Sequence, residues 1–124
     1  MQKLLFEQAW DRALSGGDRD HIVSVFEETR NAAPESALSA VVLRKAVNHK
    51  GERLLTVLLH NRSQEEAVFN DRTVAMRTDN GQAEEALFTL PVAVLAHHSM
   101  PWTFIFPAAV SNETFLNENI TLIF

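Results

Sequence analysis

One short stretch, Met100 to Pro107, constrains the fold of this chain more than any other. It reads Met-Pro-Trp-Thr-Phe-Ile-Phe-Pro, so two prolines enclose five residues that are aromatic or β-branched. Such side chains pack well on a pleated strand, whereas proline lacks the ladder donor, so we expect regular pairing to lie between the two prolines. Side chains alternate along a strand, which puts Trp102, Phe104 and Phe106 on one face. We therefore predict a strand whose aromatic face organises the core.

Composition narrows the class of protein. The chain has 124 residues, no cysteine and a net charge of −5. That length predicts a single domain, 1–124, with one core, and the lack of cysteine excludes disulfides and thiolate chemistry. The negative charge argues against a phosphate-binding surface. No apolar run approaches the roughly 18 residues of a membrane span, and Leu4-Leu5-Phe6 is too short for a signal peptide. We expect a soluble cytoplasmic protein with no nucleic-acid partner and no membrane span.

The N-terminal part of the chain predicts a helix over about 15–31. Ser15 begins a Ser-Gly-Gly-Asp run, which fits the Ser-x-x-acid start of a helix. Ile22, Val25 and Phe26 follow at helical spacing and form a stripe for burial. We expect this stripe to dock on the rest of the domain, because an isolated helix of this length is marginal in water.

From residue 37 onward the pattern is one of short strands separated by turns. Asn48-His49-Lys50-Gly51 and Asp79-Asn80-Gly81 are turn signals, since Gly and Asn tolerate positive φ. We expect mainly β structure, an antiparallel immunoglobulin-like β-sandwich with an N-terminal α-helix. The expected strands are 38–47, in which Ala40, Val42 and Ala46 alternate with Val41, Leu43 and Lys45; 52–61, apolar on both faces and therefore central; one or two strands in 67–78; 82–90; 102–106; and 120–124.

The expected core and the expected edges follow from these strands. Tryptophans can line ligand pockets, but a role as core anchors is more common. We predict a structural core of Trp10, Phe26, Trp102, Phe104 and Phe106, with Leu55, Val57 and Leu59, or the residues that alternate with them, opposite the aromatic face. A sandwich edge can accept a strand from a partner. Our candidate partner edges are the segments near 68–77 and 120–124, represented by Val74, Ile120 and Leu122.

The histidines have no spacing typical of a metal site. His97 and His98 are adjacent, so on a strand they point to opposite faces and cannot share one ion. The others, His21, His49 and His60, lack a pattern such as His-x-x-x-His. We interpret all five as solvent-exposed loop residues and predict no metal site and no cofactor.

No other residues have the arrangement of a catalytic site. The pairs Glu65-Glu66 and Glu84-Glu85 adjoin turns, where glutamates are usually solvated. No serine lies in a nucleophile elbow and there is no glycine-rich phosphate loop. Asn61 is expected to satisfy backbone groups in a turn. We therefore predict no catalytic residues.

Several distinctive features occur in one order: Trp10 precedes the Ser15 helix start, Asn61 closes the central strand, and Pro-Trp-Thr-Phe-Ile-Phe-Pro forms a late strand. In this order they resemble the SLAP domain of accessory Sec system S-layer assembly proteins. The resemblance covers roughly residues 7 to 110. The chain departs from it at Gly16-Gly17, where the family prefers glutamates, and by a further strand beyond Pro107.

The resemblance implies a non-enzymatic, cytoplasmic, protein-binding factor. Its implied partners are an accessory SecA-type ATPase, an S-layer protein precursor, or both, and a homodimer is left open. The alternative is a stand-alone β-sandwich module that binds a cell-envelope protein or inhibits a protease.

Overall fold

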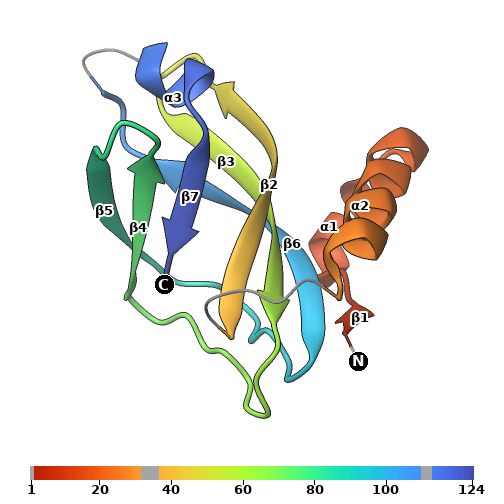
Figure 1. Ribbon diagram of the computed structural model, residues 1–124. Helices are drawn as coiled ribbons and strands as arrows, with labels where there is room; N and C mark the ends of the chain where they lie inside the picture. Colours follow the sequence, from red (N-terminus) through yellow and green to blue (C-terminus); the bar gives the residue numbers. More distant parts are fainter. Residues whose placement is uncertain (1, 32–36, 110–112) are drawn as a thin grey trace.

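The computed structural model describes residues 2–31, 37–109 and 113–124 and is mainly β. Its strands form two sheets and are mostly antiparallel (Figure 1). No helix among these residues is long and apolar enough to cross a membrane. In chain order the elements are β1 (Lys3–Leu4), α1 (Gln8–Ala13), α2 (Gly16–Thr29), β2 (Leu38–Val47), β3 (Arg53–Asn61), β4 (Arg72–Thr78), β5 (Ala83–Phe88), β6 (His98–Phe106), α3 (Glu113–Asn117) and β7 (Ile120–Ile123).

The larger sheet has the strand order β1-β6-β3-β2 and the smaller one β5-β4-β7. β3 lies inside the larger sheet and has five consecutive buried residues at its end, which confirms that it is the covered central strand. β1 joins β6 in parallel, whereas the other pairs are antiparallel. β7 lies beside β2, so the two sheets approach each other along that side (Figure 1).

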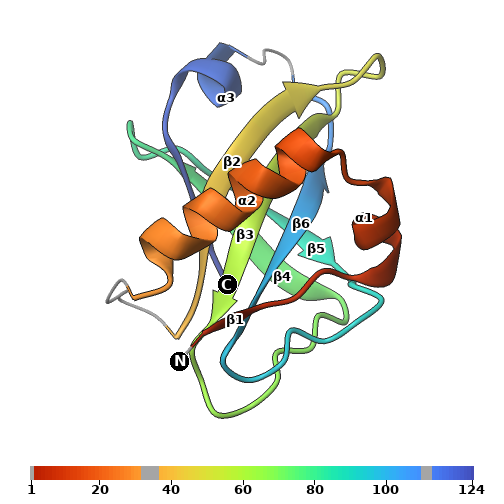
Figure 2. The same cartoon turned by 90° about the vertical axis from the view of Figure 1, so that its right-hand side faces the viewer.

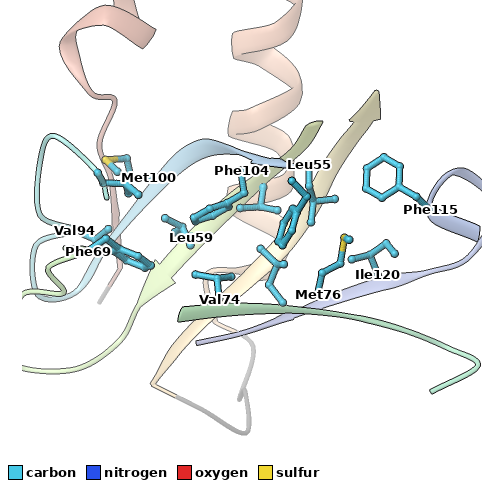
Figure 3. Packing of buried hydrophobic residues seen from close by; sticks show 14 residues of the cluster. Leu55, Leu59, Phe69, Val74, Met76, Val94, Met100, Phe104, Phe115 and Ile120 are labelled. Atoms are coloured by element: carbon cyan, nitrogen blue, oxygen red, sulfur yellow. The ribbon is translucent and has the colours of Figure 1, made fainter. Parts of the chain in front are cut away.

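The main core fills the space between the two sheets. Phe104 and Phe106 on β6 are fully buried, and Trp102 packs at the margin of the same cluster. The smaller sheet contributes Val74 and Met76 from the other side (Figure 3). The predicted aromatic strand therefore does organise the core.

The expected position of the β3 leucines was wrong. β3 and β6 are hydrogen-bonded neighbours in one sheet, with Leu55 directly beside Phe104 and Val57 beside Trp102. Residues that pair across neighbouring strands share a face. Leu55, Val57 and Leu59 therefore lie next to the aromatic face, and the second sheet stands opposite it.

Pro101 does not mark the beginning of β6, which starts three residues earlier at His98. The amide of Leu5 donates to the carbonyl of Ser99, so Ser99 directs its backbone away from β3. Because backbone direction alternates, Pro101 also has its nitrogen on the outer side of β6. Proline is tolerated there, since no bond to β3 is lost.

A bulge in β2 changes the expected alternation. The register with β3 shifts between Val42 and Arg44, so Leu43 is the extra residue. Ala40 and Val42 share a face, as the predicted alternation requires, and both pack toward the main core, but beyond the bulge it is Lys45 that lies beside the buried Leu55. Ala46 is thus on the opposite face from Ala40, contrary to our expectation.

The helices α1 and α2 form a layer on the outer face of the larger sheet, here named the N-terminal layer. α2 begins after Ser15, whose hydroxyl accepts a hydrogen bond from the Asp18 amide at 3.1 Å, which confirms the predicted cap. Ile22 and Phe26 are buried against Leu58 of β3, as the predicted stripe requires. Figure 2 shows α2 lying across this sheet.

Three short elements were not predicted. Trp10 belongs to the six-residue helix α1, in a segment whose apolar residues fit a loose helix and an irregular segment equally well. β1 has two residues and α3 has five, too few for a periodic pattern to develop.

Candidate functional site

A buried polar cluster joins the N-terminal layer to the larger sheet. Its centre is His60, which is 1% exposed. The imidazole Nδ1 lies 2.5 Å from Ser99 Oγ, and Nε2 lies 2.8 Å from Thr29 Oγ1. The Gln2 amide also donates to Ser99 Oγ, at 3.1 Å. The cluster therefore links the residue before β1 to α2, β3 and β6 through side chains.

The hydrogen bonds of Thr29 show which ring nitrogen of His60 carries the hydrogen. The Thr29 hydroxyl donates to the Val25 carbonyl at 2.7 Å, so it accepts from His60 Nε2–H. Nδ1 is then the acceptor for the Ser99 hydroxyl. Burial, and secondarily the positive charge of Arg62, lower the pKa of His60 to about 4, so the ring is neutral at pH 7. Our interpretation of His60 as an exposed loop histidine was wrong.

A serine hydroxyl that donates to a histidine has the hydrogen-bond pattern of an activated nucleophile. Ser99, however, has none of its surface exposed, and His60 has almost none. A substrate cannot reach a side chain closed off in this way. The arrangement instead satisfies polar groups that burial would otherwise leave unpaired.

A groove, here named the Trp10 groove, opens on the outer face of the larger sheet beside α1 and α2. Its volume is about 330 Å³. Trp10 and Leu14 line it on the side of α1, and Leu43, Leu54 and Thr103 line it on the side of the larger sheet. Asp18, His21 and Arg44 are exposed at its rim. Its mixed charges and largely apolar lining suit contact with another molecule more than chemistry.

The residues predicted as core lie in two separate clusters. Phe104 and Phe106 are in the main core, whereas Phe26 is in the outer-face cluster with Leu58. The two tryptophans are only partly buried and meet each other, with ring centroids 6.3 Å apart. They thus connect the two clusters at the side of β6.

The predicted partner edge at Val74 was wrong. β4 lies between β5 and β7, so Val74 is on a central strand and is fully buried. Ile120 and Leu122 are on the edge strand β7, but their side chains point into the core. The free side of β7 also adjoins β2 (Figure 1). None of these three residues presents its side chain to a partner.

The two members of each adjacent pair, His97-His98 and Glu84-Glu85, have different surroundings. His97 precedes β6 with a φ of 57°. His98 is the first residue of β6, is half-buried and has its Nδ1 2.8 Å from the Ala96 carbonyl, so its interpretation as an exposed loop residue was wrong. Glu84 is paired with Arg53 at 2.6 Å, while its neighbour Glu85 is exposed. Within the described ranges, no group of three or more histidine or acidic side chains could hold a metal ion.

Asn61 satisfies backbone groups of a turn, as predicted. Its amide nitrogen donates to the carbonyls of Glu65 and Val94, and its oxygen accepts from the Ser63 amide. The side chain therefore fixes the loop that follows β3.

A comparison of the sequence with protein-family models gives a match over nearly the whole chain. A family model described as the SLAP domain matches residues 4–124. No curated protein and no solved structure matches the chain. The match continues beyond Pro107 to the last residue, so the final strand is part of the domain and is not an addition to it. The chain therefore belongs to the SLAP domain family.

Proposed function

We propose that this chain is a non-enzymatic factor that binds another polypeptide and assists accessory Sec-dependent export or assembly of S-layer proteins. The observation that carries the proposal is the family match, which extends over residues 4–124. In this proposal the protein works in the cytoplasm with an accessory SecA-type ATPase, an S-layer protein precursor, or both. We also propose that its two sheets are arranged as an immunoglobulin-like sandwich.

The chemistry of the described residues supports binding more than catalysis. The Ser99–His60 contact is closed to substrates, and the Trp10 groove has a largely apolar lining. Exposed apolar side chains and strand edges are surfaces on which polypeptides bind. These features are independent of the family match and agree with it.

The proposal is tested in the native organism by deleting the gene and measuring secreted S-layer protein. The expected result is reduced export that the wild-type gene restores. Gentle co-purification with the tagged protein is expected to recover the accessory ATPase or the S-layer precursor. Intact S-layer export in the deletion strain, together with recovery of neither protein, would contradict the export role. The cell-envelope-binding alternative would then be preferred.

A further inference from the structure

β5 is an edge strand whose outer side is not paired with any other described strand. The edges of β2 and β7 lie beside each other, and the edge of β6 carries β1 and adjoins α1 through the contact of the two tryptophans. β5 pairs with β4 alone, and its other side faces outward at the left of Figure 1. An open edge is a template for pairing with another strand.

The backbone direction along β5 is fixed by the hairpin before it. The Thr78 amide donates to the Gln82 carbonyl at 2.9 Å, so Gln82 faces β4. Backbone groups alternate in an antiparallel ladder, so Ala83, Glu85 and Leu87 direct their amides and carbonyls away from β4. No backbone group within the described ranges bonds to these amides or carbonyls. Only another extended backbone matches their spacing along the edge.

The side chains beside this edge define the chemistry of a matching strand. Leu87 is 63% exposed, the highest value among the exposed large apolar side chains of the described residues. Glu85 lies two residues before it on the same face and is also exposed. Glu84 is engaged by Arg53, but Glu85 forms no ion pair with the described residues. The edge thus presents one free negative charge and one apolar side chain.

A second copy of this chain fits the edge poorly. In an antiparallel pairing of two β5 strands that uses all three outward residues, Ala83 is opposite Leu87 and Glu85 is opposite Glu85 of the other copy. Like charges directly opposite each other destabilise a strand pair. A strand with a lysine or arginine at that position has the opposite effect.

We propose that the β5 edge binds an extended segment of the partner polypeptide that carries a basic residue opposite Glu85 and an apolar residue opposite Leu87. This inference rests on the proposed function, because it identifies the surface by which the polypeptide is bound. The added strand extends the smaller sheet from three strands to four. Main-chain hydrogen bonds supply affinity, and the two outward side chains supply the choice of sequence.

The direct test is an NMR titration with two blocked heptapeptides, Thr-Leu-Thr-Lys-Thr-Leu-Thr and Thr-Leu-Thr-Glu-Thr-Leu-Thr. Their pattern is the same in both directions, so either strand orientation places the central residue opposite Glu85 and a leucine opposite Leu87. The lysine peptide is expected to shift and protect the amides of Ala83, Glu85 and Leu87. It should bind about threefold to tenfold more tightly than the glutamate peptide, as for an exposed charge pair.

Two variants separate edge binding from other sites. Glu85→Lys should reverse the preference between the peptides, while Glu28→Lys, the same charge change on the exposed side of α2, should leave it unchanged. Leu87→Pro removes the amide hydrogen of Leu87, which points away from β4 and forms no bond to it. The variant therefore keeps the β4–β5 pairing but should not bind the added strand. If Leu87→Pro also lowers the melting temperature, the reversal in Glu85→Lys still decides the question. Equal binding of both peptides to wild type and to Glu85→Lys, or shifts at the Trp10 groove instead, would overturn the proposal.

The last experiment distinguishes this inference from the function on which it rests. Purified S-layer precursor and accessory ATPase are offered to immobilised wild type and Glu85→Lys. Capture by wild type and at least threefold weaker capture by the variant supports the edge. Equal capture by both is compatible with the proposed function but contradicts binding at the β5 edge, whereas capture by neither contradicts the proposed function.

Self-association at the same edge is tested separately. A concentration-dependent dimer that Leu87→Pro removes would show that a second copy is the occupant.

Discussion

β3 has two buried faces, and they are stabilised in different ways. On the inner face, Leu55, Val57 and Leu59 have no exposed surface and meet an apolar, aromatic cluster. On the outer face, Leu58 packs under α2, and two residues later His60 joins a cluster of polar side chains. The inner face therefore depends on shape and apolar burial, and the outer face also depends on protonation.

The two faces consequently should respond differently to the same conditions. Apolar packing has no titratable group, so its contribution to stability does not change with pH in the mild acid range. The outer face has a histidine that must stay neutral to be buried. Substitutions and pH can therefore separate the contributions of the two faces.

The largest effect is expected in the inner core. Phe104→Ala should lower the free energy of unfolding by about 3–5 kcal/mol, because a fully buried ring is replaced by a cavity. Its ring centroid is 4.9 Å from that of Phe88 and 6.1 Å from that of Phe69. Urea denaturation measures the loss. Ile105→Ala, at the next position and 48% exposed, is the control and should cost less than about 1 kcal/mol. Equal losses for the two variants would mean that the inward face has been assigned wrongly.

A pH titration tests the outer face. In the unfolded chain His60 has an ordinary pKa of 6.5, whereas in the folded protein its pKa is about 4. Between these values the unfolded state binds a proton that the folded state does not, so stability is complete above about pH 7 and falls as pH decreases to 4. The loss should be on the order of 3 kcal/mol.

The measurement compares the free energy of unfolding of wild type and His60→Gln at pH 7 and at pH 4. The variant should lose about 3 kcal/mol less than wild type over this interval. His49→Gln, in an exposed turn, should retain the wild-type pH dependence. If His60→Gln retains it too, the neutral buried histidine is not its source.

A third substitution tests whether the N-terminal layer unfolds locally while the two sheets stay folded. Ile22→Ala should cost about 2–3 kcal/mol, because Ile22 is 4% exposed and packs against Leu58. Amide hydrogen exchange should become faster in α2 while the amides of β3 stay protected. Val23→Ala, 40% exposed on the same helix, serves as the matched control. Faster exchange throughout both sheets would indicate that the layer and the sheets unfold as one unit.

The smallest effect is expected at the start of α2. Ser15→Ala removes the acceptor for the Asp18 amide and should cost about 1 kcal/mol. Ser24→Ala lies in the middle of the same helix, on its exposed side, and should be neutral or slightly stabilising. Thermal unfolding of the pair measures the difference. A loss in Ser24→Ala as large as that in Ser15→Ala would argue against a capping role.

Sequence patterns correctly predicted those elements that depend on residues close together in the chain. Alternation identified the aromatic face of β6, Ser15 identified the start of α2, and Asn80-Gly81 identified the β4–β5 turn, in which Gly81 has a φ of 89°. The β2 bulge was not predictable in this way, because no alternation is present on either side of Leu43: Val41 and Val42 before it are both apolar, and Arg44 and Lys45 after it are both charged.

Long-range features could not be read from residue spacing. The contact of His60 with Ser99 joins positions 39 apart, and that with Thr29 joins positions 31 apart. The assignment of β4 as central and β5 as an edge depends on where β7 pairs, so the sequence could not exclude Val74 as an edge residue. Nor did any local signal separate the exposed Leu87 from the buried leucines.

Amide hydrogen exchange along β5 tests the central claim, that this edge is open and binds a polypeptide, most directly. In the free protein, the amides of Ala83, Glu85 and Leu87 should exchange fast, while those of Glu84, Ala86 and Phe88, which face β4, exchange slowly. Addition of the purified S-layer precursor or accessory ATPase should slow the first set and leave the second unchanged. Slow exchange of the first set in the free monomer, or fast exchange that neither partner alters, would contradict the claim.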